Sequence, residues 1–172
     1  MDIDALKTDQ HYTAMICNVQ IEGKPVRATI DSGAATSVMT SKLMKRLGEE
    51  IDSPSKIIIT TITGDSKRSL GVITKLRIKV NGTLTPIDVE VIEEPKVEKL
   101  ILGNDYLSMV NATIKYNEMK VVLYPKTQSR LEVDVDFYYN ESDPENYTSE
   151  EESETEYESE DSDIEEIQIH DL

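Results

Sequence analysis

The sequence predicts an all-β domain, built as a closed barrel or a sandwich with one or two short helices and followed by a disordered acidic tail. Short runs of alternating apolar residues, separated by Gly, Pro and Asn turns, extend over most of the first 130 residues. All 18 Lys and Arg residues lie there beside 16 acidic ones, whereas residues 131–172 hold the other 18 acidic residues. The 172-residue chain, with a formal net charge of −16, is therefore interpreted as one near-neutral domain with an acidic end.

The first elements are a hairpin and a short helix. In residues 14–30, apolar positions flank a Glu-Gly-Lys-Pro turn at 22–25, which predicts two antiparallel strands. Residues 41–47 place three apolar side chains on one helical face. Gly48 follows at the position of a C-terminal cap, so we expect the helix to end there.

Strands again dominate after this helix. Residues 57–62 predict a strand, and residues 76–91 predict a hairpin around Asn81-Gly82, the strongest short hairpin-turn pattern. A second short helix is predicted at 104–110 and a last hairpin at 112–124. Short strands with such frequent turns are typical of an all-β barrel or sandwich.

The segment 131–139 alternates apolar and acidic residues, which is a strand pattern with an acidic outer face. It has two interpretations: an edge strand, which would be a natural dimerisation element, or the start of the tail. From residue 140 onward the chain is nearly all acid, Ser, Thr and Tyr, which cannot bury enough apolar surface to fold. We therefore divide the chain into an N-terminal extension (1–11), a domain (12–139) and a disordered acidic tail (140–172).

Composition excludes several classes of protein. The single cysteine, Cys17, excludes an internal disulfide framework and a multi-cysteine zinc site, and its strand context predicts a core residue. His11 and His170 stand apart from other ligands, so no metal or cofactor is expected. A near-neutral domain without a basic patch argues against nucleic acid. No apolar run reaches about 18 residues and the first residues lack a signal-peptide pattern, so we expect no membrane association and a cytoplasmic location.

One loop carries the candidate chemistry. An apolar strand runs into Asp31-Ser32-Gly33-Ala34, and a Ser/Thr-rich stretch then leads to the first predicted helix. A carboxylate at a strand end followed by Gly lies in a tight turn, where backbone N–H groups can approach and orient it. Ser32 can hydrogen-bond nearby backbone and stiffen the turn. Taken alone, the tripeptide is also compatible with an ordinary β-turn.

This loop resembles the active-site loop of the retropepsin-like aspartic proteases. That family includes retroviral and LTR-retrotransposon enzymes and the protease-like domain of the DNA-damage-inducible ubiquitin shuttles. Residues 97–107, with Ile-Leu-Gly at 101–103, resemble the segment by which the family enters its C-terminal helix. Residues 62–67 occupy the place of the flap, the hairpin that closes over the substrate. The resemblance covers residues 12–125 and implies the family's closed barrel.

The resemblance also implies a homodimeric aspartic endopeptidase that acts on polypeptides without a cofactor. The family uses two aspartates facing one water molecule, whereas this chain has a single Asp-Ser-Gly. Asp105 suits the N-cap or first turn of the second helix, so Asp31 of a second copy is expected to supply the other carboxylate. Asp31 is thus the expected catalytic residue. The other expected site residues are Ser32, Gly33 and Ala34 in the active-site loop and Thr63, Gly64, Asp65 and Ser66 in the flap.

Two features differ from the retroviral pattern and keep alternatives open. Ala35 stands where retroviral enzymes usually carry an acid, which favours a transposon or shuttle type, and Asp65, Lys67 and Arg68 place charge on the flap. The first interpretation is an active endopeptidase, derived from a retroelement or processing a polyprotein. The second is a catalytically weak dimerisation or binding module with the acidic tail as its partner-binding arm. The third is a monomeric β-barrel adaptor in which Asp-Ser-Gly is a chance turn.

Overall fold

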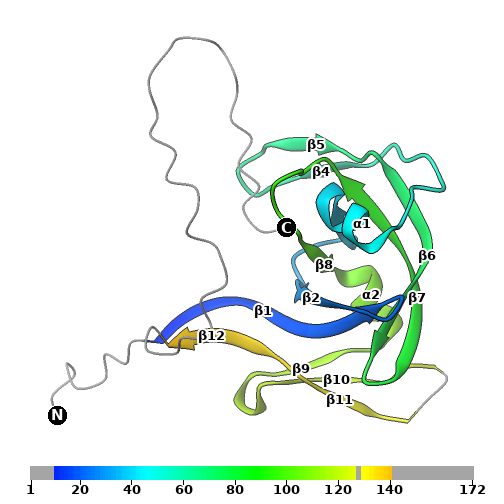
Figure 1. The fold of residues 1–172 in the computed structure, drawn as a ribbon. Helices are drawn as coiled ribbons and strands as arrows, with labels where there is room; N and C mark the ends of the chain where they lie inside the picture. Colours follow the sequence, from blue (N-terminus) through cyan, green and yellow to red (C-terminus); the bar gives the residue numbers. More distant parts are fainter. Residues whose placement is uncertain (1–9, 127–128, 141–172) are drawn as a thin grey trace, which may run out of the picture.

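The computed structural model describes residues 10–126 and 129–140. Within these residues the chain is built mainly of strands, with two short helices and one 3₁₀ turn (Figure 1). The predicted disordered tail, beyond Asn140, and most of the predicted N-terminal extension lie outside the described residues. No helix in the described part of the chain is both long and apolar enough to cross a bilayer.

Six strands close into a barrel. Following the hydrogen-bonded neighbours, β1 pairs with β2, β2 with β8, β8 with β3, β3 with β7, β7 with β6, and β6 pairs back to β1. This ring confirms the predicted all-β closed barrel with short helices. The six strands are β1 (Gln10–Ile21), β2 (Lys24–Ile30), β3 (Val38–Thr40), β6 (Gly71–Val80), β7 (Thr83–Ile92) and β8 (Leu100–Leu102).

Two smaller sheets lie at opposite ends of the barrel in Figure 1. One is a two-stranded hairpin and the other a three-stranded sheet, and a further strand, β12 (Asp136–Asn140), pairs with the outer edge of β1. The hairpin consists of β4 (Ile58–Thr60) and β5 (Ser66–Arg68), and the sheet of β9 (Thr113–Lys115), β10 (Lys120–Leu123) and β11 (Leu131–Asp134). The helices are α1 (Ser41–Leu47) and α2 (Asn104–Met109), with the 3₁₀ turn η2 at Tyr116–Glu118.

The predicted turns and caps form for the expected local reasons. Asn81 and Gly82 both have positive φ, 45° and 85°, which is the backbone that a two-residue hairpin requires. Helix α1 begins after Thr40, whose side chain accepts a hydrogen bond from the Leu43 N–H, and ends at Gly48 with a φ of 73°.

Apolar side chains fill the barrel interior in one large core. Its fully buried members come from the strands and from both helices, and they include Ile21, Leu43, Ile78 and Tyr106. Cys17 belongs to this core, as its strand context predicts. In the return strand β7, Leu84 is 50% exposed, because the strand register points threonines 83 and 85 inward instead.

The alternating segment 131–139 belongs to the domain rather than to the tail. It forms two strands, β11 beside β10 and β12 beside β1. Val133 and Val135 are buried while Asp134 and Asp136 are exposed, so its acidic face points to solvent. Because β12 lies outside the closed ring and pairs with β1 alone, it is an edge strand.

Candidate active site

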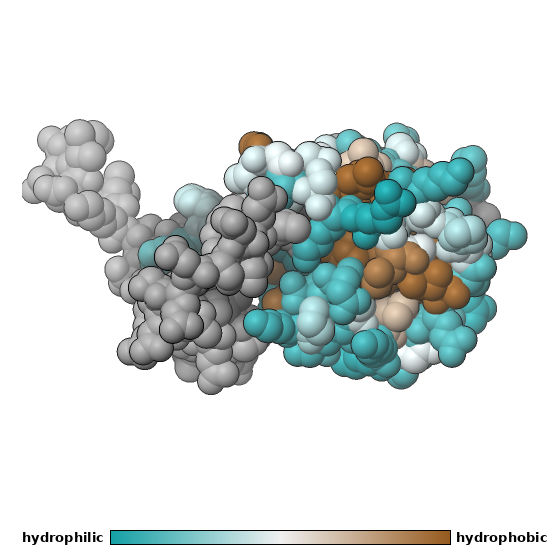
Figure 2. Space-filling view, turned by 90° about the horizontal axis from the view of Figure 1, so that it is seen from above, coloured by the Kyte–Doolittle hydropathy of each residue, from teal (hydrophilic) through white to brown (hydrophobic). Residues whose placement is uncertain are grey.

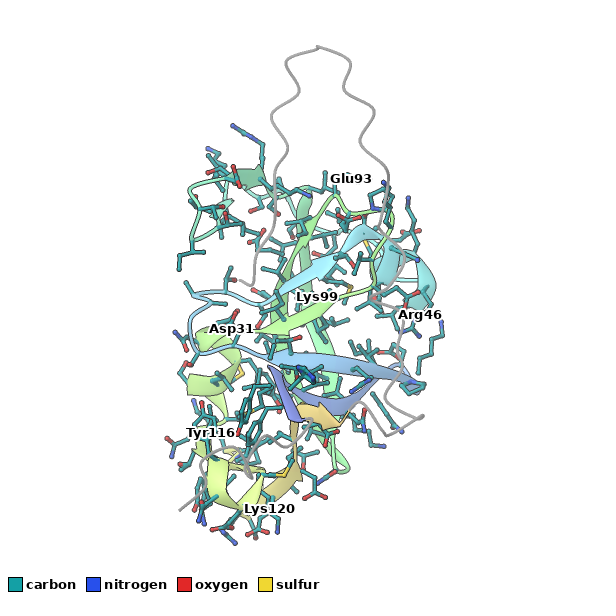
Figure 3. The ribbon with its side chains drawn as sticks, turned by 90° about the vertical axis from the view of Figure 1, so that its left-hand side faces the viewer. Asp31, Arg46, Glu93, Lys99, Tyr116 and Lys120 are labelled. Atoms are coloured by element: carbon teal, nitrogen blue, oxygen red, sulfur yellow. The ribbon has the colours of Figure 1, made fainter. Side chains whose placement is uncertain are left out.

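Asp31 lies where two parallel strands end together. β2 and β8 run parallel, with Ile30 in register with Leu102, and the Asp31 N–H donates to the Leu102 carbonyl at 3.1 Å. This bond fixes the backbone at the first residue beyond the strand. The Asp31 side chain is partly exposed, and Figure 3 shows it at the edge of the molecule.

The loop after Asp31 folds back on the carboxylate. The Gly33 N–H donates to Asp31 Oδ1 at 2.8 Å, and the Ala34 N–H donates to the Asp31 carbonyl at 3.2 Å. A Cβ at Gly33 would lie 3.1 Å from Asp31 Oδ1, so glycine leaves room for the carboxylate at this close approach. Ser32 and Gly33 are exposed, whereas Ala34 is buried. The arrangement orients one carboxylate oxygen and leaves the other without a protein donor among the described residues.

Helix α2 holds this loop from its first turn. The Asn104 N–H donates to the Ala34 carbonyl at 2.8 Å, and the Asn104 side-chain amide donates to the Ser32 carbonyl at 3.0 Å. Gly103, just before the helix, packs so closely that an added Cβ would lie 2.7 Å from the Ala34 oxygen and 2.8 Å from the Thr36 oxygen. Only a residue without a side chain permits this backbone contact.

Asp105 is a second brace, which sequence reasoning placed on the helix but did not connect to the loop. Its carboxylate accepts from the Ser37 N–H at 2.9 Å, from Ser37 Oγ at 2.7 Å and from Thr36 Oγ1 at 3.4 Å. Ser37 is fully buried, and its Oγ in turn accepts from the Gly103 N–H. Asp105 lies in the first turn of α2, as predicted, and its carboxylate oxygens accept hydrogen bonds from the end of the loop that follows Asp31.

The β4–β5 hairpin, residues 58–68, is the segment expected to be the flap, and we call it the flap hairpin. Its turn is closed by the Thr61 N–H donating to the Asp65 carbonyl at 2.8 Å, while Thr63 Oγ1 donates to Asp65 Oδ2 at 2.8 Å. Gly64 has a φ of 91° at this tip, a backbone conformation that favours glycine. Thr63, Gly64 and Asp65 thus lie together in the turn, and Ser66 begins β5. The strand β4 is shorter than the predicted 57–62.

The flap hairpin is anchored by one buried apolar side chain. Ile59 of β4 packs with Val38 of β3 and Ile92 of β7 in a small cluster separate from the main core. On the other side, Ile58 is 54% exposed and Ile62 at the tip is 92% exposed. Figure 2, which views this end of the molecule, shows apolar side chains exposed between hydrophilic ones.

A shallow hollow of about 370 Å³ opens beside Asp31. Its walls are largely apolar and aromatic, and Tyr116 packs edge-on against Phe137 with ring centroids 5.6 Å apart. Its two tyrosines are strongly exposed, Tyr12 at 75% and Tyr116 at 64%. The hollow is lined by Tyr12, Thr13, Met15, Ile30, Asp31, Ser32, Ile114, Tyr116 and Phe137.

Other reactive side chains lie away from this loop or are buried. Burial raises the pKa of the Cys17 thiol to about 12, so the thiol stays protonated at neutral pH. Within residues 10–126 and 129–140, no three His, Cys, Asp or Glu side chains come together as a metal site. His11 is an exposed residue of β1.

Comparisons with known proteins identify the family of this chain. Residues 17–109 match the family described as gag-polyprotein putative aspartyl protease. The chain is 32% identical over 108 residues to the DNA damage-inducible protein 1 of Kluyveromyces lactis, an alignment that spans 60% of this chain and 25% of that protein. The chain therefore matches only about a quarter of the length of this curated relative.

The fold is similar to the crystal structure of the retroviral protease-like domain of Ddi1 from Leishmania major. The TM-score is 0.59 at 21% sequence identity, and the match covers 80% of this chain and all of that domain. At this identity the likeness concerns the fold alone.

Proposed function

The chain belongs to the gag-polyprotein putative aspartyl protease family, and on that premise we propose that it is an aspartic endopeptidase that works as a homodimer. In this proposal Asp31 of one copy and Asp31 of its partner face a single water molecule. The substrate is a polypeptide bound in extended form beneath the flap hairpin. The family's description supports a role in processing a polyprotein.

The proposed chemistry follows from two carboxyl groups at close range. Two adjacent carboxylates cannot both ionise easily, so they hold one proton between them and titrate as a pair. The protonated carboxyl donates to the oxygen of the scissile carbonyl, while the ionised one accepts a proton from the attacking water. Gly33 and Ser32 shape the turn that presents the carboxylate, and Ala34 lines the cleft.

The main observation behind the proposal is the set of hydrogen bonds that hold Asp31 in place. Its backbone is bonded to β8, one carboxylate oxygen is held by the Gly33 N–H, and the loop is fixed to the start of α2. Asp105, the nearby acid on α2, has its oxygens engaged by Ser37 and Thr36. A second reacting carboxylate is therefore best supplied by a second copy of the chain.

The surface around Asp31 supports this assembly. The hollow beside it exposes aromatic rings that water alone would solvate poorly. A twofold contact here would bring two Asp31 loops together and cover Tyr116 at the same time. Thr63, Gly64, Asp65 and Ser66 are then proposed as the flap-tip residues that close over the peptide.

The test is cleavage of a random peptide library from mildly acidic to neutral pH. The full chain is compared with Asp31→Asn and with Asp134→Asn, which removes the same charge from an exposed position on β11. We expect cleavage by the full chain and by Asp134→Asn, and none by Asp31→Asn. Cleavage that survives in Asp31→Asn would refute the proposal.

A second candidate function is a dimeric binding module without useful peptidase activity. The observation that favours it is the charge on the flap hairpin, where Asp65 forms part of the turn and Lys67 Nζ donates to the Glu93 carbonyl at 3.1 Å. Such charge is unusual above an apolar cleft. A stable dimer that cleaves no peptide in the library would select this alternative.

A further inference from the structure

A row of residues in register crosses the sheet beneath the flap hairpin. Ile101 of β8 faces Val38 of β3, and Val38 faces Glu90 of β7. Residues in register on neighbouring strands point to the same face of a sheet. Val38 packs with Ile59 of the flap hairpin, so this is the face that the hairpin covers, and we call it the cleft face.

The same face carries Asp31. Thr29 of β2 is in register with Ile101, and Asp31 follows Thr29 by two residues. Alternation along an extended segment therefore places the Asp31 side chain on the cleft face as well. The view in Figure 3 shows Asp31 at the same edge of the molecule as the flap hairpin. Glu90 and Asp31 thus belong to one surface, separated by strands β8 and β3.

Glu90 is an unusual residue for this position because it is 6% exposed and acidic. Ser69 Oγ donates to Glu90 Oε2 at 2.5 Å. Ser69 directly follows β5, and its N–H donates to the Ile57 carbonyl at 2.9 Å, which closes the base of the flap hairpin. The carboxylate therefore lies under this base and is held by a neutral hydroxyl.

The other carboxylate oxygen of Glu90, Oε1, has no hydrogen-bond donor among the described residues. In the described part of the chain, every side-chain N or O atom that is sealed from solvent has a hydrogen-bond partner. The side-chain bond of Glu90 uses Oε2, so Oε1 keeps contact with solvent. No Lys, Arg or His among the described residues forms an ion pair with Glu90. A largely buried carboxylate without a cation is energetically costly, and a ligand that brings a cation would relieve that cost.

We propose that Glu90 is a specificity-determining residue of the cleft, and that its open Oε1 receives the Lys or Arg side chain of a bound peptide. This inference rests on the proposed function, which makes the cleft a peptide site, and it adds the chemical class of one substrate side chain. The apolar Val38, Ile59 and Ile92 would contact the aliphatic stem of that side chain, and the carboxylate would receive its charged end.

The test separates binding from cleavage. A random peptide library is bound to the full chain carrying Asp31→Asn, and the retained peptides are sequenced. We expect Lys and Arg to be enriched at one position, and the preference to fall by about tenfold or more in Asp31→Asn/Glu90→Gln. The matched control is Asp31→Asn/Glu93→Gln, which removes an exposed charge at the end of β7 and should keep the preference.

A second variant guards against a folding defect. Ser69→Ala removes the hydroxyl that donates to Glu90 but keeps the charge of the Glu90 carboxylate. The enrichment of Lys and Arg among the retained peptides should therefore persist, at a smaller size. No enrichment of basic residues, or equal enrichment with and without Glu90→Gln, would overturn the inference and leave Glu90 as an anchor of the flap hairpin only. If Glu90-dependent enrichment is found but the Asp31 chain cleaves nothing, the peptidase proposal fails and the inference stands.

Discussion

At the scale of single residues, the Asp31 loop is held both by a local hydrogen bond and by hydrogen bonds to residues distant in the sequence. The Gly33 N–H contact is local, two residues from the carboxylate. The contacts between Asp105 and Ser37 join residues 68 apart. Both kinds are needed, because a short turn orients the carboxylate whereas the long-range bonds fix where the turn lies.

Asp105→Ala should destabilise the domain and release the loop. It leaves the buried Ser37 hydroxyl and N–H without their charged acceptor, which should lower the free energy of unfolding by about 2–3 kcal/mol. Urea unfolding measures this change. The control is Ser108→Ala, an exposed residue of the same helix, for which we expect a change within about 0.5 kcal/mol. Equal stability of the two variants would show that Asp105 is not a brace.

Cys17 should be inert in the native protein and make stability fall at alkaline pH. Burial raises its pKa from an ordinary value of 9.0 to about 12. Its contribution to stability is therefore complete below pH 9 and is lost as the pH rises from 9 towards 12, since the unfolded chain ionises first. Iodoacetamide labelling at pH 8.5 should be slow in buffer and fast in urea. Rapid labelling of the folded protein would contradict the burial of this thiol.

These residues also show what a sequence can and cannot predict. Asp31, Gly33 and the turn they form were predictable because the pattern is contiguous and the physics of a Gly turn is local. The first-turn position of Asp105 was predictable for the same reason. Its bond to Ser37 was not, because it depends on the pairing of β3 with β8, which brings two distant segments together.

At the scale of elements, the flap hairpin is a small part of the described fold that lies outside the barrel sheet. Its two strands have three residues each and form a separate sheet. An isolated two-stranded hairpin is marginally stable in water, so its position depends on the buried Ile59 and on the bonds at its base. A weakly held hairpin is suited to opening and closing over a ligand.

Ile59→Ala should loosen the flap hairpin while sparing the barrel. Hydrogen exchange of residues 58–68 should quicken, and exchange in β1 and β6 should change little, because the small cluster contains no residue of these strands and is separate from the main core. Ile58→Ala is the matched control, since this neighbour is 54% exposed. Equal acceleration in both variants, or acceleration spread over the barrel, would argue against Ile59 as the anchor.

Element prediction succeeded where the pattern was periodic and the turn was explicit. The hairpin around Asn81-Gly82, the helix ending at Gly48 and the edge strand after residue 130 all form. The sequence did not decide the role of segment 131–139, because alternating apolar and acidic residues are compatible with both an edge strand and a solvated tail. Its place in the domain follows from burial of Val133 and Val135, which depends on tertiary contacts.

At the scale of the whole molecule, the barrel is a closed ring with an exposed hollow beside Asp31. The six strands form hydrogen bonds with one another around the ring. The hollow beside Asp31, in contrast, leaves aromatic side chains exposed. In the proposed dimer, a second copy would complete the site and cover this surface. Closure of the ring was expected from the family resemblance, whereas the exposed hollow depends on how η2 and β12 lie beside β1.

Tyr116→Lys should weaken self-association without unfolding the domain. Tyr116 is 64% exposed in the hollow, so a charge there would be desolvated only when two copies meet. We expect the dissociation constant to rise by at least about tenfold in sedimentation experiments, with the thermal midpoint of the dilute protein little changed. Leu84→Lys, at an exposed site away from the hollow, should leave association unaltered. Association that resists Tyr116→Lys would place the interface elsewhere.

The most direct test of the central claim, that two Asp31 residues form one catalytic unit, is a mixing experiment. Full chain and Asp31→Asn chain are combined at constant total concentration and allowed to exchange partners, and peptide cleavage is measured against the fraction of intact chain. If each site needs both carboxylates and dimers form at random, an equal mixture should retain about one quarter of the activity of the intact protein. Retention of about one half would mean that each chain works alone, and would contradict the shared site.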